Sequence, residues 1–326
     1  MVAKTHGKTD DFEVIPLLSK MSPFKLALIL LLSPAAHSMQ SQNEMGLGHT
    51  SNANLSSGNP RSDSFYRLSS ANVWPNSNGR FRLRLSFEDY FKEHYNDSLS
   101  WNASQLWKSL DGFHGWSLLG SVFGRHYTHQ SPGLTDESFS HLGTAAKAEH
   151  KDPFGRGMAL IWGPSVEIRK YLQTSERFDN SAFANAMIEF DPRARWEFNV
   201  FANAGASLSS QSEFSRLILE AGGGGAYQLD KYWDWNNELL IRRSHFLNRT
   251  ISSETATTRS RGQGVRIRSV SSKETYTTVV LSTQLTRELN STWRTGGELN
   301  WITQSSASGF QNYSAVEFYF HLTWIF

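Results

Sequence analysis

The sequence contains no cysteine, which excludes both a disulfide framework and a lipid anchor on a cysteine. It also lacks an excess of either charge, because 32 Lys and Arg residues stand against 30 Asp and Glu residues and give a formal net charge of +2. A balance so close to neutral does not indicate a nucleic-acid-binding protein. Patterns typical of nucleotide-binding loops, dinucleotide-binding folds and zinc proteases are absent as well, so no motif of these kinds predicts an enzyme.

Long apolar runs are equally scarce. The single long run, Phe24–Ala36, has 13 residues, which is too short to cross about 30 Å of hydrocarbon as a helix. Lysines flank its start and a small-residue cleavage site ends at Ser38, a pattern typical of a secretory signal peptide. We therefore expect residues 1–38 to be a signal peptide region whose true start is Met21, and residues 39–326 to form one exported domain.

Aromatic residues are abundant, at 13% of the chain, and many of them lie in segments of alternating polarity. The clearest segment is 80–88, RFRLRLSFE, in which the apolar side chains share one face and the charged side chains share the other. Such segments recur about every 12 to 20 residues, whereas helical periodicity is nearly absent. The pattern predicts an all-β protein, a closed antiparallel transmembrane β-barrel with apolar residues facing lipid and polar residues facing the lumen.

The C-terminal segment Val316–Phe326 alternates in the same way, and its apolar face includes Trp324 and Phe326. A final strand of alternating aromatics that ends on phenylalanine resembles the assembly signal of bacterial outer-membrane barrels. The resemblance implies a multi-pass β-barrel in the cell outer membrane, surrounded by outer-membrane lipid. It also implies that the barrel-assembly machinery recognises this strand through Trp324 and Phe326.

Turn residues between the alternating segments predict 14 strands, with 12 to 16 strands as the alternatives. The predicted strands are 43–52, 62–74, 79–91, 98–109, 113–127, 139–150, 156–171, 182–190, 195–208, 213–229, 233–249, 275–289, 292–304 and 312–326. Short turns are expected on the periplasmic side and long loops outside. The longer loops are expected at 53–61, 128–138, 172–181 and 250–274. The last of these leaves two alternatives open, one long loop or an extra hairpin.

The alternation also assigns polar side chains to the barrel interior. The predicted interior set is Arg80, Arg82, Arg84, Glu88, Lys147, Glu149, Glu167, Arg169, Arg195, Glu197, Asn199, Arg242, Glu298, Glu317 and His321. One interpretation is a conducting lumen in which an arginine ladder (Arg80, Arg82 and Arg84) attracts anions. The opposite wall is then set by three glutamates, Glu88, Glu298 and Glu317. The alternative is a closed interior in which Arg/Glu pairs only neutralise buried charge.

A histidine and a serine lie two residues apart in the first predicted strand, in the stretch GLGHTSNANL. Residues at this spacing share a face and lie about 7 Å apart at the backbone, so the imidazole of His49 can reach the hydroxyl of Ser51, as base-assisted nucleophilic catalysis requires. We expect both to face lipid, with Asp63 of the next strand in reach as the orienting acid.

The stretch His49-Thr50-Ser51-Asn52 resembles the His-x-Ser-Asn motif of outer-membrane phospholipase A and lipid A 3-O-deacylase. The resemblance implies a serine lipid esterase using His49, Ser51 and Asp63, with calcium as a cofactor only in the phospholipase case. It departs from both families because the motif lies in the first strand and because the third residue is Asp, where those families have Asn or Glu.

A broader resemblance covers residues 46–91. A first strand that ends in a Ser-Asn-x-Asn turn, followed by a polar loop and a Tyr-rich second strand, is similar to the opening of large porin-like and export barrels of bacteria. In this interpretation Ser51 and Asn52 only shape the exit from the strand. The resemblance implies a passive pore or export conduit for small polar or anionic solutes or surface polymer, with no cofactor. A third hypothesis is a structural or adhesive barrel whose loops 128–138 and 250–274 bind partners.

Overall fold

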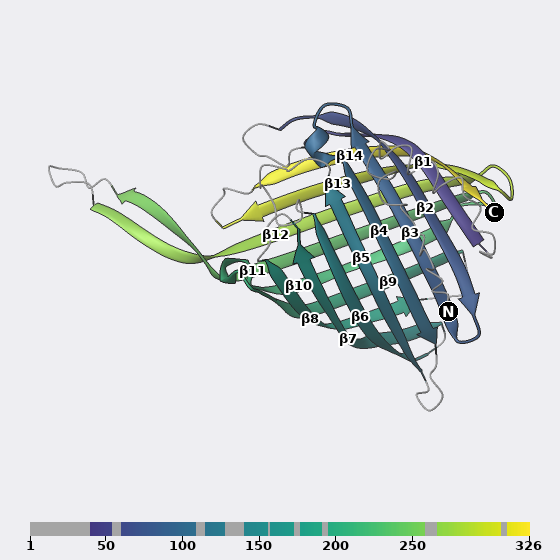
Figure 1. Ribbon diagram of the computed structural model, residues 1–326, viewed down its shortest axis with the longest axis horizontal. Helices are drawn as coiled ribbons and strands as arrows, with labels where there is room; N and C mark the ends of the chain where they lie inside the picture. Colours follow the sequence, from purple (N-terminus) through teal and green to yellow (C-terminus); the bar gives the residue numbers. More distant parts are fainter. Residues whose placement is uncertain are drawn as a thin grey trace, which may run out of the picture.

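The computed structural model describes residues 40–53, 60–108, 115–127, 140–155, 157–172, 177–190, 195–257, 266–307 and 312–326. They form fourteen antiparallel strands that close into a barrel (Figure 1). The predicted all-β barrel and the predicted number of strands are therefore confirmed. The expected signal peptide region, 1–38, lies outside the described residues.

The strand bounds follow the predicted ones closely. The strands are β1 (Gln40–Thr50), β2 (Asp63–Asn76), β3 (Gly79–Tyr90), β4 (Ser98–Lys108), β5 (Trp116–Tyr127), β6 (His141–Pro153), β7 (Met158–Tyr171), β8 (Phe178–Phe190), β9 (Trp196–Ser209), β10 (Arg216–Gln228), β11 (Trp233–Thr257), β12 (Arg266–Glu288), β13 (Trp293–Ser306) and β14 (Tyr313–Ile325). Two 3₁₀ helices, η1 (His94–Asn96) and η2 (Ser212–Phe214), lie between strands. Because β8 begins at Phe178, the loop predicted at 172–181 is shorter than expected.

The barrel is closed by the pairing of its first and last strands. β1 and β14 run antiparallel in a register that aligns Met45 with Leu322 and Thr50 with Glu317. Every other strand pairs with its neighbours in sequence, so the ring of described strands has no free edge. Backbone N–H and C=O groups find no water in a bilayer, and this closure is therefore what allows the strands to span one.

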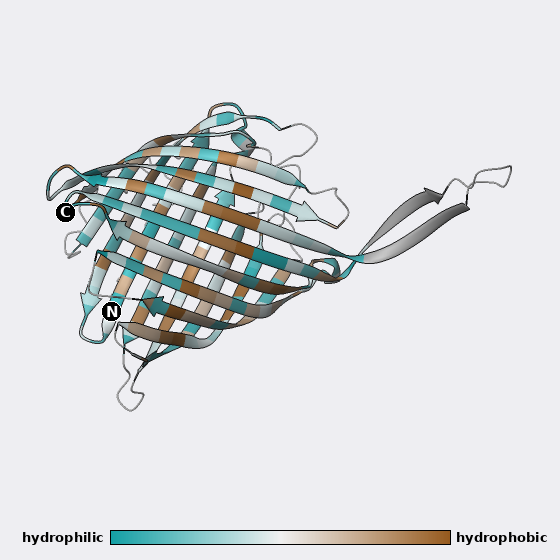
Figure 2. Cartoon of the chain, turned by 180° about the vertical axis from the view of Figure 1, so that it is seen from behind, coloured by the Kyte–Doolittle hydropathy of each residue, from teal (hydrophilic) through white to brown (hydrophobic). Residues whose placement is uncertain are grey.

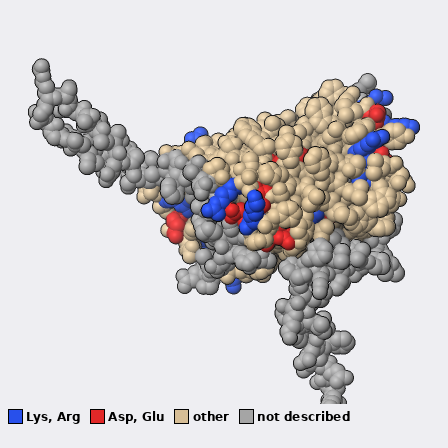
Figure 3. Space-filling model, turned by 90° about the horizontal axis from the view of Figure 1, so that it is seen from above, with Lys and Arg blue, Asp and Glu red and all other residues tan. Residues whose placement is uncertain are grey.

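The outer surface of the barrel carries a belt of apolar side chains. Leu47, Trp196 and Phe320 are about two-thirds exposed, at 61%, 60% and 66%. Figure 2 shows apolar positions alternating with polar ones along the strands, and in Figure 3 the charged side chains form separate groups with a largely uncharged stretch between them. No helix among the described residues is long and apolar enough to cross a membrane. An apolar belt on a closed ring indicates strands that face lipid.

Aromatic pairs lie on the outer wall near one end of the barrel, the turn end, where β2 meets β3 and β10 meets β11. Trp116 contacts Trp162 with ring centroids 5.5 Å apart, and Trp293 contacts Trp324 at 5.7 Å. Amphipathic aromatic side chains are favoured at the level of lipid headgroups. These pairs therefore mark one of the two membrane interfaces.

The opposite end, the loop end, carries a long hairpin of β11 and β12 that projects beyond the barrel wall (Figure 1). Thr250–Thr257 pairs with Arg266–Lys273 after a register irregularity that follows His245. Residues 250–274 are thus neither one long loop nor an extra pair of strands in the ring, but largely a continuation of two barrel strands. Apolar residues are few there, so the main sequence signal for a strand is missing.

A buried arginine fixes the loop end beside β8. The Arg177 guanidinium lies between the rings of Tyr171 and Phe214, 4.1 and 3.7 Å from their centroids. It donates two hydrogen bonds to the Asp179 carboxylate, at 2.9 and 3.3 Å, and the residue is 2% exposed. Stacking and bidentate pairing together tie the connection between β7 and β8 to η2.

Replacement of Arg177 by Ala is expected to lower the free energy of unfolding by about 3 kcal/mol, because it leaves the Asp179 carboxylate buried without its partner. Urea unfolding of the refolded barrel in detergent micelles measures this change. Arg61→Ala is the matched control, since it removes an exposed pair with Glu93 (3.2 Å) and should cost less than about 1 kcal/mol. Equal losses in the two variants would show that the burial of Arg177 contributes nothing.

Candidate functional site: the barrel lumen

The inner face of the barrel holds the side chains that the alternation assigns to the interior. Residues aligned across neighbouring strands point to the same side of the sheet. Arg67 of β2 is aligned with Glu88 of β3, and the two side chains meet inside the barrel at 2.7 Å. From this pair, the alignment of neighbouring strands can be followed around the whole ring. It places every residue of the predicted interior set on the inner face except Arg195, which precedes β9. That these residues line a conducting path stays a prediction.

A network of ion pairs occupies one side of the lumen near the loop end. Arg67 lies 2.7 Å from Glu88 and 3.7 Å from Glu317, and Arg125 lies 3.4 Å from Glu88. The Arg67 guanidinium also lies 4.5 Å from the ring centroid of Tyr319. The expectation that Glu88 and Glu317 form a wall opposite the arginine ladder is therefore wrong. They neutralise Arg67 and Arg125, and Glu88 belongs to the same strand as the ladder.

Further pairs neutralise charge on other strands. Glu167 and Arg169 meet on β7 at 2.7 Å, and Glu220 of β10 meets Arg242 of β11 at 2.6 Å. A third contact, from Asn203 to Glu220 at 3.1 Å, satisfies another carboxylate oxygen. In this part of the lumen, Arg/Glu pairs neutralise the interior charge, as the second interpretation of the interior residues predicted.

The seam between β14 and β1 is filled on its inner side. His321 is 5% exposed, stacks on Tyr319 with ring centroids 5.7 Å apart, and lies 3.5 Å from Glu44. Gly48 of β1 makes room for the Phe65 ring, because a Cβ atom at this position would lie 2.3 Å from the nearest ring atom. Packed side chains therefore fill the inner side of this seam.

The arginine ladder differs from Arg67, Arg125, Arg169 and Arg242 because it has no carboxylate partner among the described residues. Within the described residues, none of its three side chains makes an ion pair or a hydrogen bond. Its register neighbours on β2 and β4 are uncharged, and the Nε of Arg82 is buried without a hydrogen-bond partner. Successive members are about 7 Å apart at the backbone, so their positive potentials add.

An acidic cavity lies across the ring from the ladder. In the ring of fourteen strands β10 is seven places from β3 in both directions, so β9, β10 and β11 form the facing wall. A cavity of about 590 Å³ along this wall is lined by Glu189, Glu197, Glu238 and Glu298, and by no lysine or arginine. Glu189 pairs with Lys151 of β6, whereas the other three make no ion pair among the described residues. These glutamates and the ladder arginines all lie in the turn-end halves of their strands. The lumen thus has a basic and an acidic side at its turn end.

The alternating pattern predicted Glu197 and Glu298 as interior residues, but not Glu189 and Glu238. Glu238 lies in the stretch WNNELL, where polar and apolar residues do not alternate, and Glu189 stands at the end of its strand beside an aromatic residue. The register supplies what the pattern lacks, because it aligns Glu238 with Gly224 on the inner face of β10. Having no side chain, this glycine leaves the cavity open.

One cavity in the loop-end half of the lumen is bordered by both walls. A cavity of about 340 Å³ is bordered at once by Thr50 and Arg125 from one wall and by Arg242 and Gln304 from the other. Side chains of both walls therefore border the same cavity in this half of the lumen. A solute that enters from the loop end therefore passes Arg125 and Arg242 first.

The residues of the hydrolase hypothesis do not form a triad. His49 faces outward, as expected, but its Nδ1 lies 3.0 Å from the hydroxyl of Ser64, and the Ser51 Oγ accepts a hydrogen bond from the Val316 N–H at 2.9 Å. Asp63 is 1% exposed and aligned with the inward-facing Thr50, so it lies on the other side of the wall from His49. The expectation that Asp63 orients His49 is therefore wrong, and Ser64, the observed partner, was missed.

Asp63 has a different role, because its carboxylate holds the connection between β3 and β4. Its Oδ2 accepts hydrogen bonds from the backbone N–H groups of Lys92 and Glu93, at 3.0 and 2.8 Å, and its Oδ1 accepts one from the Ser64 N–H at 2.7 Å. A buried carboxylate with three N–H donors needs no catalytic role to explain it.

Comparison with known proteins adds no family. No family model and no curated protein matches the chain. Among solved structures, the anion-selective porin from Comamonas acidovorans is 5% identical with a TM-score of 0.47, over 88% of this chain and 98% of that one. A bacterial polysaccharide outer membrane secretin is 10% identical with a TM-score of 0.46, over 87% and 98%. An outer membrane channel from Pseudomonas putida F1 is 10% identical with a TM-score of 0.42, over 89% and 96%.

Likeness at this level concerns the barrel fold alone. The closed ring of strands and its lipid-facing apolar belt are the features that place the chain in a membrane. The protein is a multi-pass β-barrel of the bacterial outer membrane.

Proposed function

We propose that the protein is a passive outer-membrane pore for small anionic and polar solutes. The observation that carries this proposal is the arginine ladder, three inward cationic side chains without a carboxylate partner among the described residues. Three unpaired charges in a dry, closed interior would each cost several kcal/mol. A lumen filled with water removes that penalty, so the ladder fits an open channel better than a packed interior.

Diffusion along the charged lumen is the mechanism. An anion that passes the loop-end half meets the ladder, where positive potentials spaced at about 7 Å lower its energy along the turn-end half. The low-dielectric barrel wall strengthens these potentials relative to open water. The glutamates of the facing cavity create a field across the lumen, which orients solutes that carry a dipole. The cavity of about 340 Å³ that both walls border favours small solutes over a bulky surface polymer as cargo.

The outer surface of the barrel suits contact with lipid and with the barrel-assembly machinery. The apolar belt is covered by outer-membrane lipid. Phe326 is 73% exposed and Trp324 belongs to the outward face of β14, where the barrel-assembly machinery can reach both. For the adhesive alternative the hairpin of β11 and β12 is the element that extends farthest from the barrel, while residues 128–138 fall in a segment outside the described residues.

Replacement of the three ladder arginines by Ser is expected to shift ion selectivity toward cations. Removing one charge about 7 Å from a permeating anion changes its energy by about 0.6 kcal/mol in water, which is roughly threefold in occupancy. The anion-to-cation permeability ratio should therefore fall at least about threefold. The reversal potential of single channels in a salt gradient measures it, and an unchanged potential would remove the ladder from the mechanism.

The matched variant changes the facing wall. Glu197→Gln, Glu238→Gln and Glu298→Gln together should move the same reversal potential in the opposite direction, because they remove negative charge from the lumen. Both shifts should shrink between 0.1 M and 1 M salt, since the Debye length falls from about 10 Å to about 3 Å. Shifts of the same sign in the two variants would show that conformational damage is being measured.

The esterase alternative makes a separate prediction. Because the Ser51 hydroxyl is bonded to the Val316 N–H and Asp63 is beyond the reach of His49, the refolded protein should release no more fatty acid from phospholipid than its Ser51→Ala variant does. Release is measured by titration of free fatty acid in mixed micelles, with and without calcium. Activity abolished by Ser51→Ala and by His49→Ala would contradict the pore as the principal function.

A further inference from the structure

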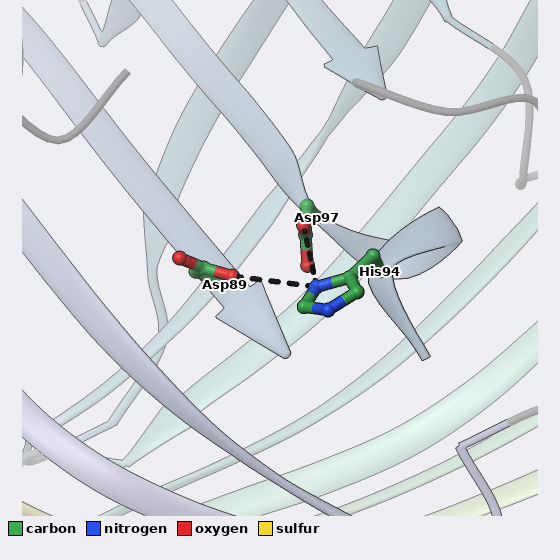
Figure 4. A group of neighbouring side chains, drawn as sticks. All are labelled: Asp89, His94 and Asp97. Atoms are coloured by element: carbon green, nitrogen blue, oxygen red, sulfur yellow. Dashed lines mark ion pairs between the residues drawn. The ribbon is translucent and has the colours of Figure 1, made fainter. Parts of the chain in front are cut away.

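Three side chains with metal-binding groups converge at the loop end, outside the lumen (Figure 4). Asp89 lies at the end of β3, His94 opens η1, and Asp97 directly precedes β4. One ligand atom from each lies within 4.8 Å of the others. The His94 Nδ1 is 3.3 Å from an Asp97 oxygen and 4.0 Å from an Asp89 oxygen, so an imidazole and two carboxylates surround one point.

Both carboxylates are oriented by donors from outside the cluster. The Oδ1 of Asp97 accepts a hydrogen bond from the Tyr90 N–H at 2.7 Å, and its Oδ2 points toward His94. The Oδ2 of Asp89 accepts from the Tyr66 hydroxyl, and its Oδ1 points toward His94. In each case one oxygen is held by the fold and the other is aimed at the shared point. This is the outer-shell arrangement that fixes metal ligands in proteins.

The segment that carries His94 is itself anchored. The buried Asp63 accepts hydrogen bonds from the Lys92 and Glu93 N–H groups, and the Asn96 amide donates to the Ala53 carbonyl at 2.9 Å. These bonds fix the segment on both sides of His94. A bound ion would therefore find its ligands already in place, and little ordering entropy would oppose binding.

The donor set indicates the kind of ion. One imidazole nitrogen with two carboxylate oxygens suits zinc-class divalent transition metals, whereas calcium and magnesium prefer oxygen ligands alone. The two carboxylates place their negative charges close together. The Asp97 side chain is 12% exposed and the His94 side chain is 57% exposed, so solvent can enter the site from the side of His94. A dication would offset the repulsion between the carboxylates and keep open positions for water.

We propose that Asp89, His94 and Asp97 form a binding site for a zinc-class divalent transition-metal ion at the outer rim of the barrel, with Tyr66 as an orienting residue. The ion would tie the end of β3 and the start of β4 to η1. This site lies on the outward side of the wall and does not depend on the pore function.

Equilibrium dialysis of the refolded full-length barrel in detergent micelles against Zn²⁺ tests the proposal, with bound metal counted per chain. We expect one tightly bound ion in the wild type and loss of that ion in His94→Gln and in Asp97→Asn. Tyr66→Phe keeps the ring but removes the hydroxyl, and it should weaken binding by about tenfold or more. His49→Gln is the matched control, because it removes another outward histidine at the same end that contacts a hydroxyl and no carboxylate.

A second probe distinguishes the ion class. Co²⁺ in place of Zn²⁺ should give a ligand-field absorption band in the wild type and in His49→Gln, and none in His94→Gln. Heat-modified mobility of the folded barrel on gels shows whether each variant still folds. Wild-type binding in His94→Gln, or Ca²⁺ bound as tightly as Zn²⁺, would overturn the zinc-class assignment. Absence of any tight Zn²⁺ in the folded wild type would show that the cluster is an internal ion pair only.

Discussion

The pairing of β1 with β14 is the interaction on which the rest of the structure depends. A strand in a bilayer must find partners for every backbone N–H and C=O group, and a ring is the only sheet in which no strand is left at an edge. Once the register aligns Thr50 with Glu317 at this seam, every strand has two neighbours. Closure then fixes which side chains face lipid and which face inward, because successive residues alternate between the two surfaces.

Closure also brings charged residues together from strands that are far apart in the sequence. Most of the interior charge near the loop end resolves into pairs such as Arg67 with Glu88 and Arg242 with Glu220. The turn-end half also holds pairs, Lys147 with Glu149 and Lys151 with Glu189. There, however, the arginine ladder and Glu197, Glu238 and Glu298 lie on different sides of the ring and form no ion pair among the described residues. A dry interior would favour collapse of such charges into pairs, and the hydrated passage that we propose removes this cost. The function we propose follows from this separation.

The two-residue alternation of polar and apolar side chains in the sequence predicted much of this architecture. In the stretch RFRLRLSFE it identified both faces of β3, and the final aromatic strand and the turn residues led to the correct strand number. What the pattern could not supply was register. It placed Glu88 opposite the ladder, although alignment with Arg67 makes it part of the paired network.

The same gap explains the error at the opening motif. His49 lies on the outer face as predicted, but the residue aligned with it across β2 is Ser64, and Asp63 one position away points inward. A shift of one residue in a strand reverses the face, so a catalytic group assigned by spacing alone can fall on the wrong side of the wall. The cluster of Asp89, His94 and Asp97 was equally hidden, because it forms only when β3, η1 and β4 are packed together.

The claim that most needs testing is that the lumen is open to ions. Single-channel recording of the refolded wild-type protein in a planar bilayer tests it directly, with heat-modified gel mobility to verify folding. If the lumen is open, the folded barrel will give discrete, stable conductance steps. A correctly folded barrel that inserts into the bilayer and passes no current would contradict this claim, and would mean that the separated charges line a closed interior.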